Sequence, residues 1–217
     1  MSYLSEYCTV VRSWIDDEDI SDDVIETWVR DAEERINNEL RVDIMIQRTQ
    51  ATFDDQCAEL PPDCLEVLYL KYAGGRPLTF IVNQAYWDLT DPDGVTPTLD
   101  PKVVYDPLGH RRKAVYTIVG RTLFILPGFS EESKPTMTLG YYQQIQPLGD
   151  FKSGVFDRFP AIYRNCTLAA GAPYLMEDER VPTWAGLATA LIEKANAAHK
   201  RARFGGSPIT PVIRGFG

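Results

Sequence analysis

The hydrophobic pattern of this 217-residue chain changes period twice, and this change constrains its fold more than any other feature. Apolar residues recur every three to four positions over 4–40, fall into short strand-like runs over 44–142, and return to the helical period over 156–202. The helical segments at both ends of the chain must bury their apolar faces against each other or against the strands. We therefore predict an α+β fold, in which a helical bundle formed by the N- and C-terminal helices carries an inserted small antiparallel β domain.

Turn-forming segments and changes in the hydrophobic pattern predict the domain boundaries. Residues 1–43 and 150–204 are predicted to form the helical bundle, and residues 44–149 the inserted β domain. The Gly-Gly-Ser-Pro segment after residue 204 stops the last helix, so residues 205–217 are predicted to be a flexible C-terminal tail.

Within the bundle, the first two helices are expected to pack antiparallel, with Ser21 as the N-cap of the second. Gly171 and Pro173 predict a kink or break in the third helix. Gly120 predicts a tight hairpin in the β domain. The expected helices cover 4–15, 24–40, 156–176 and 184–202, with a short one at 83–89. The expected strands cover 44–53, 67–72, 76–80, 115–119, 122–126 and 136–142, and the role of the long loop 90–113 is left open.

Charge is distributed unevenly along the chain. Residues 1–40 contain twelve acidic and three basic side chains, so they carry the whole formal net charge of −9. From Lys194 onward the chain has five basic residues and no acidic one. This polarity suits head-to-tail or layered association, although a solvated helix face is the more frequent explanation of an acidic run. Tight DNA binding is disfavoured, because it requires a large basic surface.

No pattern of catalytic or ligand-binding residues is found. The phosphate-loop, dinucleotide, zinc-protease and serine-hydrolase motifs are absent from the sequence, and the acidic stretch 16–23 fits no calcium-loop register. Four cysteines without a C-x-x-C pair and two distant histidines give no zinc template, so reduced thiols are expected. Glu33 and Glu34 are interpreted as part of a solvated helix face. We therefore predict no catalytic residue, no cofactor and no metal.

The sequence also lacks membrane and secretion signals. Its apolar runs are far shorter than the roughly 18 residues of a spanning helix, and its start has neither a basic region nor a cleavage site. We expect the protein to remain in the cell that makes it and to bind no membrane.

Several segments, in order, resemble the head-to-tail connector family of tailed phages, the adaptor ring beneath the portal, which is similar to the podovirus tail tubular protein A. The segments are 32–41, 60–63, 77–80, 116–120 with 123–127, 141–142, 172–175, 178–180 and Trp184. The long Asp/Pro-rich stretch between Thr90 and Lys113 departs from the family pattern.

The resemblance implies a structural virion protein without a catalytic set. It implies a ring, commonly of twelve copies, that binds the portal protein on one side and a tail nozzle or tail tube protein on the other. DNA would pass through its channel only in transit during genome ejection. Location at the head-tail junction of the virion, after assembly in the host cytoplasm, follows from the same resemblance.

The C-terminal tail is the expected contact with the portal or a neighbouring subunit. Its apolar side chains are too few to fold alone, and ordering them requires a partner that buries them. A frayed terminus is the alternative. The predicted interaction residues are Arg201, Arg203, Ile209, Val212, Ile213, Arg214 and Phe216.

Two other functions remain open at this stage. A cell-wall lytic adaptor would need a carboxylate acid near the β domain, for which Glu59 and Glu66 are the obvious candidates. A generic soluble interaction domain, unrelated to virions, is the third hypothesis.

Overall fold

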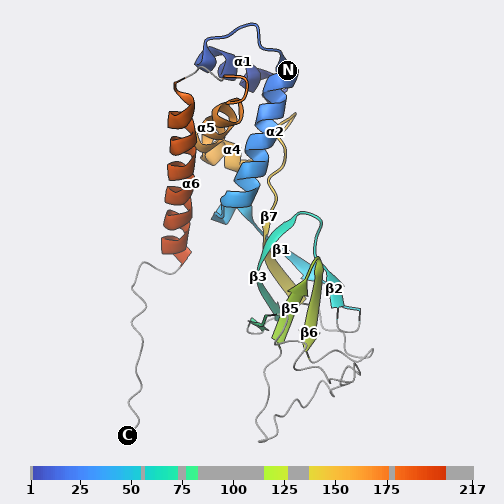
Figure 1. Cartoon of the computed structure of the whole chain (residues 1–217). Helices are drawn as coiled ribbons and strands as arrows, with labels where there is room; N and C mark the ends of the chain where they lie inside the picture. The colour runs from blue at the N-terminus through green and yellow to red at the C-terminus, as the bar shows by residue number, and fades with distance from the viewer. Residues whose placement is uncertain are drawn as a thin grey trace, which may run out of the picture. The chain divides into compact units, whose positions relative to one another are not determined.

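The computed structural model describes residues 2–54, 57–72, 77–82, 115–126, 137–175 and 179–203. The chain divides into two compact units, Met1–Met45 with Gln144–Gly217, and Ile46–Gln143. The first unit holds the helices, and the second holds the strands (Figure 1). The predicted α+β class, with helices from both ends of the chain flanking a small sheet region, is confirmed.

The helical unit contains five α-helices and one short 3-10 helix among its described residues. They are α1 (Tyr3–Ile15), α2 (Asp22–Glu39), η1 (Asp43–Met45), α4 (Gly154–Arg158), α5 (Pro160–Ala170) and α6 (Val181–Arg203).

Local sequence explains where the first two helices start and stop. The Ser2 hydroxyl accepts the backbone N–H of Ser5, and Asp16 ends α1 with a left-handed backbone, φ 61°. Ser21 occupies the N-cap position of α2, as expected, but makes no side-chain capping hydrogen bond. Asp22 and Asp23 lie in the first turn of α2, where negative charge complements the helix dipole.

The centre of the helical unit is α5, which packs against both α2 and α6. Figure 1 shows α1 lying across the end of α2 and not along it, so the antiparallel packing expected for these two helices is wrong. The reason is that the buried apolar side chains of α2 pack against α5. Helix α1 instead covers the end of both helices. The buried apolar side chains of α2 are those of Ile25, Trp28, Val29, Ala32 and Ile36.

The third expected helix is interrupted twice. Phe159, with φ −129° and ψ 54°, separates α4 from α5, and Pro160 opens α5. Proline at the first helical position costs no hydrogen bond and ends the preceding helix. The expected break at Gly171 is also present, as the C-cap of α5.

The strand unit contains two small sheets. One has the order β1-β7-β3 and the other the order β2-β6-β5-β4. The pairs are antiparallel except β4 with β5, which is parallel and two residues long. The strands are β1 (Ile46–Ala51), β2 (Cys57–Glu59), β3 (Cys64–Tyr72), β4 (Thr79–Phe80), β5 (Val115–Val119), β6 (Thr122–Leu126) and β7 (Met137–Gln143).

The β5–β6 hairpin has the predicted bounds, with Gly120 in its turn at φ 62°. Strand β2 was not expected, and the expected helix 83–89 and loop 90–113 lie outside the described residues. The core cluster of this unit is apolar apart from its tyrosine hydroxyls, and the side chain of Thr117 is buried in the same unit. The cluster is made of Ala51, Phe53, Ala58, Leu70, Leu78, Tyr116, Leu123, Ile125, Met137, Leu139 and Tyr141.

Candidate functional site

Within the described ranges, no group of three or more His, Cys, Asp or Glu side chains could hold a metal ion. No helix in the same ranges is long and apolar enough to cross a membrane. The acidic turn between α1 and α2 is organised by protein groups instead. Arg12 donates to the carbonyl of Ile20 at 2.8 Å and pairs with Asp22, and the Asp17 carboxylate accepts the N–H of Asp19 at 3.0 Å.

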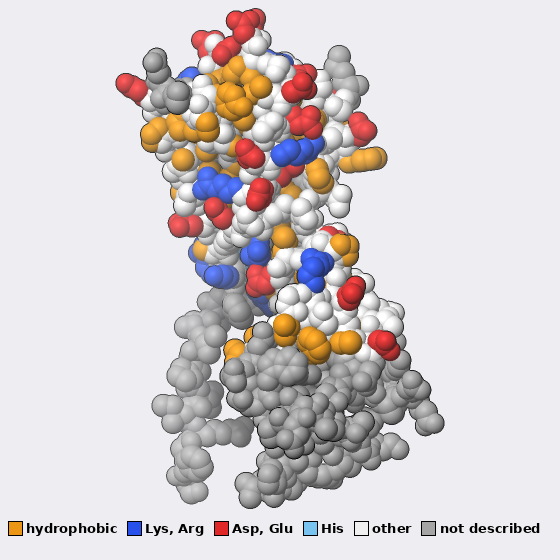
Figure 2. Space-filling view, turned by 45° about the vertical axis from the view of Figure 1, so that its right-hand side comes forward, with side chains coloured by type: hydrophobic (Ala, Val, Ile, Leu, Met, Phe, Trp, Pro, Cys, Tyr) orange, Lys and Arg blue, Asp and Glu red, His pale blue; other side chains and the backbone are white. Residues whose placement is uncertain are grey.

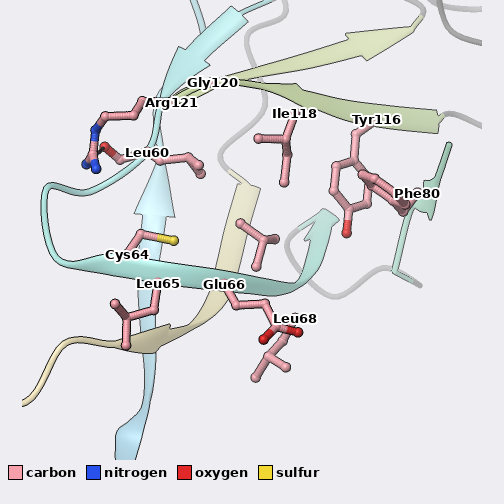
Figure 3. A pocket seen from close by; sticks show the side chains of 11 residues that line it. Leu60, Cys64, Leu65, Glu66, Leu68, Phe80, Tyr116, Ile118, Gly120 and Arg121 are labelled. Carbon is pink, nitrogen blue, oxygen red and sulfur yellow. Dashed lines mark hydrogen bonds between the residues drawn. The ribbon is translucent and has the colours of Figure 1, made fainter. Parts of the chain in front are cut away.

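The two carboxylates considered for a lytic activity lie on different strands, and both are exposed. Glu59 faces Thr122 across the β2–β6 pair. Glu66, on β3, lines an open hollow of about 510 Å³ between β3 and the β5–β6 hairpin (Figure 3). Glu66 is the one carboxylate among the described residues that line this hollow, whereas a glycosidase needs two carboxyl groups across the bond that it cleaves.

The rest of the hollow is mainly apolar. Its wall includes Leu60, Val67 and Ile118, and Phe80 stacks edge-on against Tyr116 with ring centroids 5.5 Å apart. Arg121, at the hairpin turn, donates to the carbonyls of Leu60 and Pro61 at 3.3 and 2.6 Å. This surface suits an apolar contact better than hydrolytic chemistry.

All four cysteines are free thiols. Burial raises the pKa of Cys166 to about 11, and burial also raises the pKa of Cys8 and of Cys64. A raised pKa keeps a thiol protonated and unreactive. These side chains act as small apolar groups in the packing.

The helical unit has a buried polar cluster centred on Glu33 of α2, which is 5% exposed. Its carboxylate accepts the backbone N–H of Leu148 at 2.6 Å and the hydroxyl of Tyr163, and it pairs with Arg30 at 2.9 Å. Burial, together with the negative charge of Glu33, raises the pKa of Tyr163, so this tyrosine stays a neutral donor.

One turn further along α2, Asn37 continues this cluster. Its side-chain oxygen accepts the N–H of Ile145 at 2.9 Å, and its carbonyl accepts from Arg41 at 2.7 Å. Glu33 and Asn37 together therefore fasten the segment 145–148 to α2.

The prediction that Glu33 and Glu34 belong to a solvated helix face is correct for Glu34, which is exposed. It is wrong for Glu33, which is buried. Glu33 lies four positions after Val29 and three before Ile36, which are both buried. That spacing is the sequence signal that could have identified it as a buried carboxylate.

The predicted interaction residues are only partly within the described chain. Arg201 and Arg203 are exposed in the last turn of α6, where positive charge complements the helix dipole. Arg201 also donates to the carbonyl of Ala197 at 3.4 Å. Ile209, Val212, Ile213, Arg214 and Phe216 lie outside the described residues.

The structure thus consists of a helical unit with a strand insertion, and the described residues hold no His, Cys, Asp or Glu group that could bind a metal ion. Comparison with protein families identifies the class as a phage adaptor. The model of the SU10 adaptor protein family matches residues 2–212, so the chain belongs to this family. No curated protein matches the chain. The match supports the resemblance to phage adaptors in general and does not extend to the podovirus tail tubular protein A.

Proposed function

We propose that this protein is the head-to-tail adaptor of a tailed phage virion, and that its copies form a ring, of twelve in the simplest case, beneath the portal. The match of the SU10 adaptor family to residues 2–212 carries this proposal. The ring would bind the portal on one side and a tail nozzle or tail tube protein on the other. It would assemble in the host cytoplasm and remain in the virion, with DNA crossing its channel during ejection.

The charge of the helical unit supports a passive role toward DNA. Asp23, Asp31 and Glu34 lie on the exposed face of α2 and form no ion pair within the described residues. Negative charge repeated around a ring opposes the counterion release that drives DNA binding. We propose that this face is turned to the channel, to solvent or to a neighbouring copy, and that it does not grip DNA. Tight, salt-sensitive binding of duplex DNA by the isolated protein would contradict this.

The basic end of α6 and the tail beyond it form the proposed anchor. Arg201 and Arg203 begin a basic and apolar C-terminal segment that would be ordered by burial against the portal or a neighbouring subunit. Deletion of residues 206–217 is expected to leave the melting temperature unchanged and to weaken docking. Equal decoration of portal by the truncated and intact chains would show that the tail is not the anchor.

Electron microscopy of the protein mixed with its portal tests the main proposal. Free subunits are expected to stay monomeric and to assemble on the portal template. Portal particles should therefore gain an added ring. Particles that show no added density at a saturating concentration of folded protein would refute the proposal.

A further inference from the structure

Helix α1 exposes a line of apolar side chains on the side turned away from its core. Tyr3, Val10 and Trp14 are separated by seven and four positions, which places them on one helical face. They are 40%, 46% and 43% exposed. Phe151, which is 80% exposed, lies close to the start of this line, because the N–H of Leu4 bonds to the carbonyl of Gly149.

Two cations are stacked on the aromatic rings of this line. The ammonium of Lys152 lies 4.4 Å from the ring centre of Tyr3, and the guanidinium carbon of Arg164 lies 4.0 Å from that of Trp14. We call this surface the α1 patch, and it consists of Tyr3, Val10, Trp14, Phe151, Lys152 and Arg164.

Among the described residues, the cations of the α1 patch have no carboxylate partner. Lys152 and Arg164 form no ion pair with the residues that the structure describes, and the buried Nε of Arg164 has no hydrogen-bond acceptor. Stacking on an aromatic ring holds each cation in place but leaves its hydrogen-bonding capacity unused. The chemistry that completes such a surface is a carboxylate beside apolar or small side chains.

The same chain presents such carboxylates elsewhere. Asp23, Asp31 and Glu34 line one face of α2, together with Thr27 and Asn38, and none of these carboxylates has an ion-pair partner among the described residues. Figure 2 shows acidic side chains gathered over the α1–α2 end of the helical unit. We call Asp23, Asp31 and Glu34 the α2 acidic face. It is turned away from α5, whereas the α1 patch includes Arg164 of α5, so the two surfaces are distinct.

We propose that the α1 patch of one copy binds the α2 acidic face of the next copy. This inference rests on the proposed ring, and it names the surfaces through which neighbouring subunits recognise each other. A contact between two different surfaces of the same chain is heterologous, and such a contact closes into a ring when repeated with a fixed rotation. Opposite charges at its edge set the register and speed association, and salt weakens them.

Charge reversal tests the pairing. One variant carries Lys152→Glu with Arg164→Glu, and a second carries Asp31→Lys with Glu34→Lys. Each variant alone places like charges at every contact between copies. The number of portal particles that carry a ring should therefore decrease at least tenfold. An equimolar mixture restores opposite charges at every contact when the two variants alternate, and it should recover the rings. Lys152→Glu alone, at an exposed side chain, gives a smaller loss and replaces the first variant if Arg164→Glu impairs folding.

The control reverses Lys194, an exposed residue of α6 before its basic last turn, to Glu as the match for Lys152→Glu, and it should decorate portal as the wild type does. Electron microscopy counts the ringed particles, and circular dichroism confirms that each variant is folded. The pairing would be overturned if each variant alone decorated portal fully, or if the mixture formed no more rings than the separate variants. In either case, rings formed by the wild-type protein would still uphold the proposed function. Wild-type protein that forms no ring on portal would instead refute the proposed function itself.

Discussion

The indole of Trp28 rests directly on the backbone of Gly171. A Cβ atom added at Gly171 would lie 2.9 Å from Cε3 of Trp28, closer than real side-chain contacts allow. Trp28 is 1% exposed and its ring also meets Tyr174, with centroids 5.5 Å apart, so it cannot move aside freely. Gly171 is therefore needed for the close approach of α2 to the end of α5.

Gly171→Ala is expected to lower the free energy of unfolding by about 1–3 kcal/mol, because it overpacks a filled core. Urea unfolding followed by tryptophan fluorescence measures this. The matched control is Gly186→Ala on α6, where an added Cβ meets nothing within 4 Å. There the better helix propensity of alanine should raise stability by roughly 0.5–1 kcal/mol. Equal effects of the two substitutions would contradict the packing described.

The Glu33 cluster gives a second contrast between neighbouring residues. Glu33→Ala leaves the N–H of Leu148 and the hydroxyl of Tyr163 without their acceptor, and it removes one of the two carboxylates that pair with Arg30. We therefore expect the free energy of unfolding to fall by about 3 kcal/mol. Glu34→Ala, at an exposed position, should change stability by less than about 0.5 kcal/mol. Amide hydrogen exchange at Leu148 should accelerate in the Glu33 variant alone. Unchanged exchange there would show that Glu33 does not hold the 145–148 segment.

Stability should fall at high pH because of buried tyrosines. Burial raises the pKa of Tyr7 from 10.0 to about 12. The neutral form is favoured in the folded protein, so this contribution is intact below pH 10 and is lost as the pH rises from 10 to 12. Tyr7→Phe removes the ionisation and should flatten the decline in melting temperature over this interval. A decline as steep as that of the wild type would contradict the burial of the Tyr7 hydroxyl.

The rate of thiol labelling should distinguish Cys57 from Cys166. Cys166 is 1% exposed and its pKa is raised to about 11, so very little of it is thiolate at pH 8. Cys57 is half-buried on the short strand β2. Iodoacetamide should therefore label Cys57 long before Cys166 in the folded protein, with both labelled equally in urea. Mass spectrometry of the digested protein gives the order, and early labelling of Cys166 would contradict the packing around α5.

The sequence predicted those elements whose local signals agree with their tertiary environment. The β5–β6 hairpin has two short apolar runs with Gly120 in the turn between them, so its bounds were predicted correctly. Strand β2 is three residues long in a turn-rich stretch, and its pairing with β6 defines it more than its own composition does. The break before Pro160 was missed because the apolar period continues across it.

The polar cluster was missed for a different reason. Charge alone placed Glu33 in solvent, whereas its burial depends on partners at positions 148 and 163, far away in the sequence. Lys152 and Arg164 were likewise not singled out, because their stacking on Tyr3 and Trp14 arises only when α4 and α5 fold against α1.

Counting the copies bound to one portal tests the central claim most directly. Native mass spectrometry of portal titrated with the adaptor should show bare portal and portal carrying one complete ring, with few intermediates, because neighbouring copies support each other. The simplest count is twelve. Gradual addition of single copies without a preferred complete number, or no binding at all, would contradict an adaptor ring.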